Sequence, residues 1–202
     1  MKLVVQLMGK APLPGYAKTR LIPALGPDGA AAAQRRLMTR LCSIVGAWVA
    51  ASPRRSWRLW ADPDLTHPCW RELAPAEHLR VQPPGDLGAR MSFIAREGLK
   101  EADAVFLLGT DTASTDFQLL DDAESALAQG RAVLAPAEDG GYTLLGLRRW
   151  HPALFHEISW GGATVAEQTR SRFHALGWPW WESQPQWDVD DAASWFRFVS
   201  EM

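Results

Sequence analysis

Long apolar runs, paired cysteines and an excess of charge of one sign are all missing from this sequence of 202 residues. No run approaches the roughly 18 apolar residues that a membrane span requires, so we expect a cytoplasmic protein with no membrane partner. The only cysteines, Cys42 and Cys69, form neither a CxxC pair nor a disulfide framework, which fits a reducing compartment. A net charge of −2 gives no general electrostatic case for binding a nucleic acid polymer.

The spacing of apolar residues predicts strands that alternate with helices. Strands are predicted at 3–8, 57–61, 79–82, 104–108, 132–135, 142–147 and 178–181. Helices are predicted at 28–51 with Asp28 as its cap, at 87–100, 116–129 and 163–176, and from about Asp191. This pattern indicates an α/β protein, a single three-layer α/β/α domain over residues 1–202. Its sheet is mostly parallel, and the turn at 138–141 adds one antiparallel strand.

Ligands of open parallel sheets bind beyond the carboxyl ends of the strands. Three segments that carry both glycine and charge take this position, at 9–20, 109–112 and 138–142. We therefore expect the functional site to be built from these three loops.

The first of these loops, from Gly9 to Arg20, is rich in basic residues and follows the first buried strand. Gly9 lets the backbone approach a phosphate, while Lys10, Lys18 and Arg20 supply charge-assisted donors. The loop matches neither the GxxxxGK[ST] nor the GxGxxG phosphate motif. A solvated basic loop is the alternative, but the position favours phosphate binding, by Lys18 and Arg20 more than by Lys10.

Aspartates from two distant parts of the chain are candidate ligands for Mg²⁺ or Mn²⁺. Asp111 follows the buried strand 104–108, and Asp188 and Asp190 lie on one side of an extended segment. Carboxylates on one side repel each other unless a cation or a basic residue lies between them. Capping of a turn by Asp111, or of the last helix by Asp190 or Asp191, is the alternative.

Two further aspartates lie in loops at the same edge. Asp139 belongs to a hairpin turn that can also present its carboxylate to a ligand. Asp86 opens the helix predicted at 87–100, where it either caps the helix or marks a helix start that contacts a nucleotide.

Six segments of the chain appear in the order of one known family: KAPLPGYAKTRLIPALG, QPPGDLGARM, LLGTD, APAEDGGYTLLGL, LFHEISW and WDVDDAASW. Together they resemble the DUF2064 group of GT-A-like glycosyltransferases, some of which are associated with arsenosugar biosynthesis. More distantly, they are similar to molybdenum-cofactor guanylyltransferase and phospholactate guanylyltransferase. The resemblance covers about residues 2–195, and it implies a nucleotide-diphospho-sugar transferase fold of the GT-A type.

The resemblance also implies roles for particular residues. It places the basic loop at the nucleotide phosphates and makes Asp111 a catalytic metal ligand, with Asp188 and Asp190 as its partners. Asp139 would belong to the catalytic donor or acceptor pocket, and Asp86 to the nucleotide site.

Trp160 and Tyr142 are placed on the acceptor side. There the family tends to have Trp-Ser-Thr where this chain has Trp160-Gly161-Gly162, so a hydroxyl group is missing. The family also usually has Asp-x-Pro where this chain has Asp111-Thr112-Ala113, a change that removes no ligand.

We therefore expect a metal-dependent glycosyltransferase that uses a nucleotide-sugar donor, a small-molecule acceptor and Mg²⁺ or Mn²⁺. One alternative is a guanylyltransferase-like nucleotidyltransferase that acts on a nucleoside triphosphate and releases pyrophosphate. A second is a non-catalytic nucleotide-binding protein, because fold sharing does not fix function. The base, the sugar, the acceptor and the oligomeric state stay open. A homodimer is the default expectation, because dimers are the commonest oligomers of soluble proteins.

Overall fold

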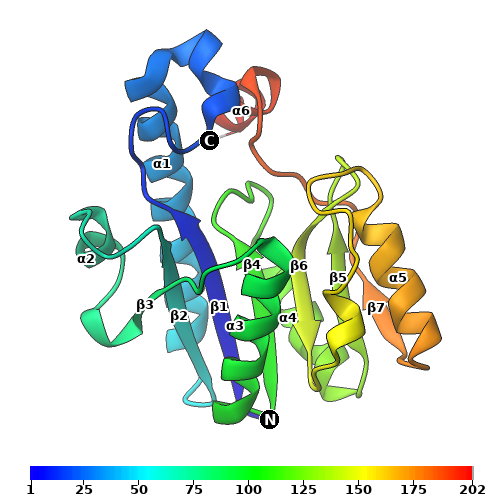
Figure 1. Cartoon of the computed structure of the whole chain (residues 1–202). Helices are drawn as coiled ribbons and strands as arrows, with labels where there is room; N and C mark the ends of the chain where they lie inside the picture. The colour runs from blue at the N-terminus through cyan, green and yellow to red at the C-terminus, as the bar shows by residue number, and fades with distance from the viewer. Residues whose placement is uncertain (202) are drawn as a thin grey trace.

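A computed structural model describes residues 1–201 and contains a central seven-stranded sheet (Figure 1). The strand order is β3-β2-β1-β4-β6-β5-β7. The strands are β1 (Leu3–Lys10), β2 (Arg55–Asp62), β3 (Leu79–Val81), β4 (Ala104–Gly109), β5 (Ala132–Pro136), β6 (Tyr142–Leu147) and β7 (Trp180–Glu182). Only β6 runs antiparallel to its neighbours β4 and β5 among the strands described, which confirms the expected mostly parallel sheet.

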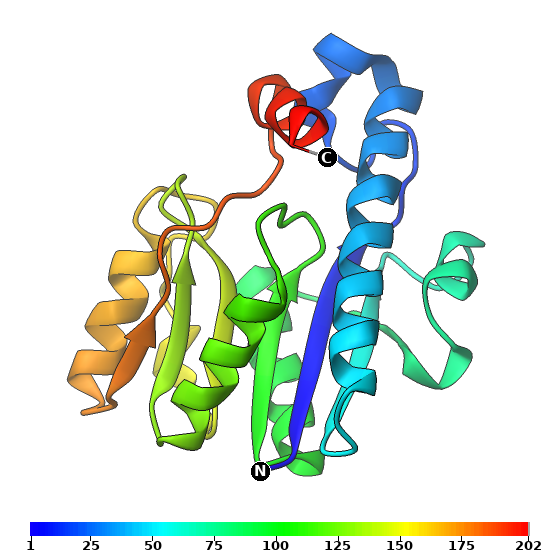
Figure 2. The same ribbon diagram turned by 180° about the vertical axis from the view of Figure 1, so that it is seen from behind.

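Helices cover both faces of this sheet (Figures 1 and 2). They are α1 (Ile22–Ala50), α2 (Cys69–Leu73), α3 (Leu87–Glu101), α4 (Phe117–Ala128), α5 (Val165–Ala175) and α6 (Ala192–Ser200). Short 3₁₀ turns lie at η1 (Thr19–Leu21), η2 (Ala76–His78) and η3 (Pro152–Leu154). The expected three-layer α/β/α arrangement is therefore confirmed.

Burial explains why the central strands read as continuous apolar runs. Every residue from Leu3 to Leu7 and from Ala104 to Leu108 is buried, because helices pack on both faces of β1 and β4. One core cluster joins the sheet to α1, α2 and α4, and a second joins it to α3 and α5. These two cores hold the central strands rigidly and so fix where their carboxyl ends lie.

The carboxy-terminal segment takes a separate path across the top of the molecule (Figure 2). It leaves β7, crosses the carboxyl edge of the sheet and ends in α6, which packs beside the start of α1. Val189 and Phe198 are buried there in a small cluster with Leu21 and Leu37. This apolar anchor keeps the segment over the edge of the sheet.

Several local predictions differ from the structure. The predicted start of the first helix at Asp28 is wrong, because α1 begins at Ile22 and is kinked at Gly26, which has a φ of 70°. Pro27 then opens the long regular part of the helix, so Asp28 follows that start and does not cap it. The short helix α2 was not predicted, since five residues are too few to show a helical period.

Within residues 1–201, no helix combines the length and the apolar character that a membrane crossing needs.

Candidate functional site

The carboxyl ends of β1, β2, β4 and β5 meet at one edge of the sheet, because these strands are parallel. A cavity of about 780 Å³ opens at this edge. Nearly all of the candidate residues line it: Gly9, Lys10, Lys18, Arg20, Asp111, Asp139, Tyr142, Trp160, Asp188 and Asp190. The structure thus brings the three predicted loops together with the carboxy-terminal segment.

Backbone hydrogen bonds bring the distant aspartates together. Thr112 and Asp188 form an antiparallel bridge between the loop after β4 and the carboxy-terminal segment. The Val189 N–H donates to the Asp111 carbonyl at 3.1 Å, and the Ala113 N–H donates to the Trp187 carbonyl at 3.0 Å. This short ladder fixes the register and sets Asp188 beside Asp111.

The result is an acidic triad made of Asp111, Asp188 and Asp190. One carboxylate oxygen from each of the three residues lies within 4.8 Å of the others. Oxygen atoms of carboxylates are the ligands that Mg²⁺ and Mn²⁺ take in proteins, so the donor set fits a hard divalent cation. The expected convergence of these residues is present in the structure.

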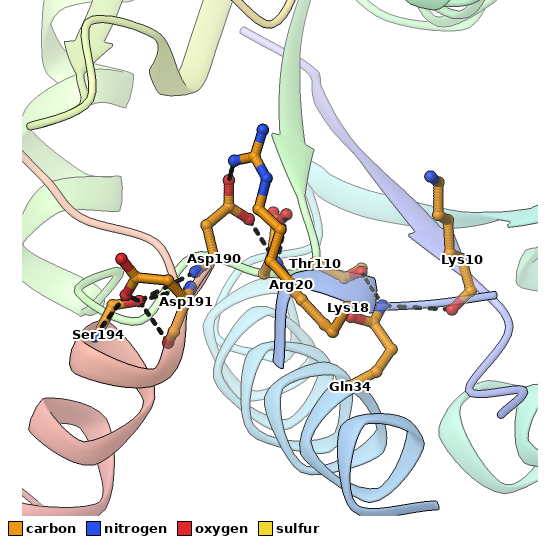
Figure 3. A network of polar contacts seen from close by, with 9 residues as sticks. Lys10, Lys18, Arg20, Gln34, Thr110, Asp190, Asp191 and Ser194 are labelled. Carbon is orange, nitrogen blue, oxygen red and sulfur yellow. Dashed lines mark hydrogen bonds and ion pairs between the residues drawn. The ribbon is translucent and has the colours of Figure 1, made fainter. Parts of the chain in front are cut away.

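Two basic side chains from the first loop, Lys18 and Arg20, contact members of this acidic triad, and Figure 3 shows both beside Asp190. The Lys18 ammonium donates to Asp111 at 3.1 Å and to Asp190 at 3.0 Å, and its side chain is only 7% exposed. Arg20 donates to Asp190 at 3.3 Å and is 74% exposed. Lys10 lies apart from them, and Gln34 of α1 donates to the Lys10 carbonyl at 3.2 Å.

The charges of this group perturb one another. Burial alone would lower the pKa of Lys18, but the attraction of Asp111 and Asp190 outweighs it and raises that pKa. Burial opposes ionisation of Asp111, yet the nearby Lys18 ammonium holds the pKa of Asp111 below its ordinary value. Burial, followed by repulsion from Asp111 and Asp190, raises the pKa of Asp188 to about 7. Asp188 is therefore the carboxylate whose charge is least compensated.

Asp139 is held in the cavity wall by a tight turn. Its carboxylate accepts a hydrogen bond from the Gly141 N–H at 2.8 Å. Gly140 has a φ of 90°, and a Cβ atom there would lie 2.0 Å from the Ala163 carbonyl oxygen. The turn consequently requires glycine at this position, and it packs directly on the loop that carries Trp160.

The residues predicted for the acceptor side form one wall of the cavity. Tyr142 and Trp160 pack edge to face, with ring centroids 6.4 Å apart. Burial raises the pKa of the Tyr142 hydroxyl, so it stays protonated across the ordinary pH range. Beside them, the Thr143 hydroxyl is buried and has no hydrogen-bond partner among the described residues.

Asp86 is the candidate that the structure separates from the others. Its carboxylate accepts from the Ala89 N–H at 2.8 Å and caps α3, and Asp86 is not among the residues that line the cavity. The capping alternative describes this geometry, whereas its neighbours Gly85 and Leu87 do reach the cavity.

A second polar group, which was not predicted from the sequence, lies in the same cavity at the ends of β2 and β3. Asp62 is buried, accepts from the Tyr16 hydroxyl at 2.6 Å and pairs with Arg90 at 3.0 Å. Burial, together with the hydrogen bond to Asp62, raises the pKa of Tyr16 to about 12. Gln82 also contacts Arg90, at 3.3 Å. The signal was the position of Asp62 at the carboxyl end of a strand, the same rule that selected Asp111.

Comparison with known proteins identifies the family. The model of a family described as "Uncharacterized protein conserved in bacteria (DUF2064)" matches residues 47–162, more than half of the chain. The chain belongs to this family, as its sequence motifs predicted. No curated protein matches the chain.

Solved structures show what the fold is similar to. A proposed nucleotide-diphospho-sugar transferase from Desulfovibrio desulfuricans is 28% identical, with a TM-score of 0.83, over 95% of this chain and 84% of that chain. Rv0371c from Mycobacterium tuberculosis, solved in complex with manganese, is 12% identical with a TM-score of 0.54, and the match covers both chains completely.

A cytidylyltransferase for 2-C-methyl-D-erythritol 4-phosphate from Thermus thermophilus is 11% identical, with a TM-score of 0.53 over 100% of this chain and 98% of that chain. The fold is therefore the one shared by nucleotide-diphospho-sugar transferases and cytidylyltransferases, in agreement with the expected fold class.

Proposed function

We propose that this chain is a transferase that binds a nucleotide sugar and holds a divalent cation, Mg²⁺ or Mn²⁺, at the acidic triad. The observation that carries the proposal is the meeting of the acidic triad with Lys18 and Arg20 inside one cavity at the carboxyl edge of the sheet. Such a site suits a diphosphate, because hard cations are typically held by one or two carboxylates plus ligand phosphates. Lysine and arginine add charge-assisted hydrogen bonds to the same oxygens.

The chain's own residues divide the work of binding and orientation. Arg20 is exposed, and its ion pair is with Asp190. It can therefore turn from Asp190 to a phosphate oxygen without leaving a buried charge unpaired. Asp139, fixed by its turn, is placed to accept a hydrogen bond from a ligand hydroxyl. When bound, the cation would supply compensation for the negative charge that develops on the departing diphosphate.

The cavity wall that contains Tyr142 and Trp160 suits an acceptor or a sugar. Tyr142 and Trp160 offer an apolar surface of the kind that packs against sugar rings. Asp62 and Arg90 supply a second set of polar contacts in the same cavity for the remaining part of the nucleotide.

The proposal is tested by ligand-dependent thermal stabilisation. We expect nucleotide diphosphates and nucleotide sugars to raise the melting temperature more with Mn²⁺ than without it, because a ligand of the folded form stabilises it. Asp111→Asn should lose this Mn²⁺-dependent shift. Asp122→Asn, which removes the same charge on the exposed side of α4, should keep it. No Mn²⁺-dependent shift with any nucleotide in the unmodified protein would refute the proposal.

A nucleotidyltransferase is the second candidate, because structures of similar fold include a synthetase bound to CTP, at 11% identity and a TM-score of 0.53. The two candidates differ in their product. In the presence of Mn²⁺ and an acceptor panel, a nucleoside triphosphate transfers its nucleotidyl group to an acceptor and releases pyrophosphate only under the second candidate. A nucleotide sugar transfers its sugar to an acceptor and releases a nucleoside diphosphate only under the first. The 28% identity to a proposed nucleotide-diphospho-sugar transferase favours the first. Nucleotide binding without turnover on a broad acceptor panel would instead indicate a non-catalytic protein.

A further inference from the structure

Lys18 is the most enclosed cation of the cavity. Its side chain is 7% exposed, compared with 74% for Arg20, and its ammonium lies about equally far from Asp111 and Asp190, at 3.1 and 3.0 Å. No other basic side chain of the described residues bridges two members of the acidic triad.

The backbone is arranged to bring Lys18 to this position. Lys18 has a φ of 50° and a ψ of 43°, a left-handed conformation that residues with a side chain seldom adopt. Buried Ala17 and Leu21 anchor the loop on either side, and the Leu21 N–H donates to the Lys18 carbonyl at 2.8 Å. Unusual backbone that the surrounding fold enforces is commonly found at functional positions.

The ammonium uses the same carboxylates that a divalent cation would need. Three carboxylates within 4.8 Å of one another repel strongly, and Lys18 lowers this repulsion by contacting two of them. A second cation at those carboxylates would in turn be repelled by the ammonium, because like charges at close range in a cavity interact strongly. Lysine and a divalent cation are thus competitors for one set of oxygen atoms.

We propose that Lys18 is an internal substitute for the divalent cation: it holds Asp111 and Asp190 in the metal-free protein and leaves them when the cation binds. This inference rests on the proposed function, because it takes the acidic triad as the cation site. Once released, the ammonium is free to donate to a phosphate oxygen of the ligand. Binding of the cation and binding of the phosphate are then linked through Lys18, and each favours the other.

Titration with Mn²⁺ tests the competition directly. Lys18→Met removes the charge and keeps an unbranched side chain, so we expect the Kd for Mn²⁺ to fall about tenfold or more, as expected when a charged hydrogen-bonded competitor is lost. Lys10→Met is the matched control, since it removes the same charge from the same cavity at a side chain that lies over the Tyr16 ring. It should change the Kd much less. Circular dichroism verifies that both variants are folded.

A second measurement needs no variant. The chain has only four lysines, Lys2, Lys10, Lys18 and Lys100, so limited acetylation followed by mass spectrometry resolves each one. We expect Lys18 to be protected in the metal-free protein and to be modified several-fold faster with saturating Mn²⁺. The rate at Lys100, on an exposed part of α3, should stay constant.

The outcomes separate the two proposals. Two results would overturn the substitute role alone, provided that Asp111→Asn no longer binds Mn²⁺. One is weaker or unchanged Mn²⁺ binding by Lys18→Met. The other is continued protection of Lys18 in the Mn²⁺-saturated protein. Failure of the unmodified protein to bind Mn²⁺ at all overturns the proposed cation site, and the substitute role with it. Tighter binding by Lys18→Met together with faster labelling of Lys18 supports both.

Discussion

Replacing Asp188 by asparagine should stabilise the metal-free protein and at the same time weaken its binding of Mn²⁺. Asp188 belongs to the acidic triad, yet Lys18 donates to the other two members and not to Asp188. Asparagine keeps the shape of the side chain and removes the charge. The substitution therefore relieves a repulsion in the folded state while it deletes one ligand of the proposed cation site.

The gain in stability expected for Asp188→Asn follows from the raised pKa of Asp188. A rise in the pKa of Asp188 from 3.8 to about 7, caused first by burial and then by repulsion from Asp111 and Asp190, corresponds to about 4 kcal/mol. Partial exposure of the side chain screens this energy, so we expect a gain of about 2 kcal/mol. Between these two pKa values the folded protein retains a proton that the unfolded chain has lost. The stability of the unmodified protein therefore falls as the pH rises through this range.

Urea unfolding followed by circular dichroism measures the effect at two pH values. Asp188→Asn should match the unmodified protein at about pH 3, which is below the ordinary pKa of 3.8, so that the carboxyl group is largely protonated in both states. It should exceed the unmodified protein in stability at about pH 8. Asp190→Asn is the control, since Asp190 pairs with Lys18 and Arg20 and its loss should destabilise the protein at pH 8. Both variants should bind Mn²⁺ more weakly. Lower stability of Asp188→Asn at pH 8 would refute the reasoning.

Three further predictions concern the surroundings of the cavity. Gly140→Ala should lower the free energy of unfolding by about 2–4 kcal/mol, because a positive φ and a backbone clash act together. Gly161→Ala, which has a φ of 78° but open space around it, should lower it by about 1 kcal/mol. Equal losses for the two variants in urea unfolding would contradict this. Cys42 and Cys69 should resist a thiol reagent at about pH 8 until the protein unfolds, since burial raises their pKa values to about 12 and 11; rapid reaction of the native protein would contradict this. Ser114→Ala should lower the free energy of unfolding by about 1 kcal/mol, since the Ser114 hydroxyl accepts a hydrogen bond from the Trp187 N–H of the carboxy-terminal segment at 3.0 Å. The same change should weaken Mn²⁺ binding, and an unchanged Mn²⁺ affinity would count against this anchoring role.

The sequence was informative wherever one local pattern determined the structure. The apolar run 104–108 predicted a strand buried on both faces, and the rule for parallel sheets then placed Asp111 at the carboxyl edge, where ligands are expected. Alternation along the segment 188–190 correctly put its two aspartates on the same side. The position of the proposed site was therefore predictable before any coordinates.

The partners of the charged residues were less predictable, because they depend on contacts between distant parts of the chain. The ion pair from Lys18 to Asp190 spans 172 positions, and the pattern around Lys18 indicates only a basic loop. The group formed by Asp62 and Arg90 was missed for the same reason, since Asp62 lies outside the recognised motifs and pairs with a residue from a separate part of the chain. Asp86 shows the opposite problem: a local pattern allowed two roles, and the structure shows the cap.

The bridge between Thr112 and Asp188 has a consequence for how this family can diverge. Its hydrogen bonds join main-chain atoms, so they do not depend on which side chains occupy residues 112, 113, 187 and 189. Substitutions at these four positions leave the bonds themselves intact, but all four residues are buried, so only side chains that fit the surrounding core preserve the spacing of the carboxylates. Proline at 113 or 189 would remove one of the two bonds, because proline has no N–H to donate. In homologues that carry the Asp-x-Pro pattern, the bond from residue 189 alone would hold the aspartates at 111 and 188 together.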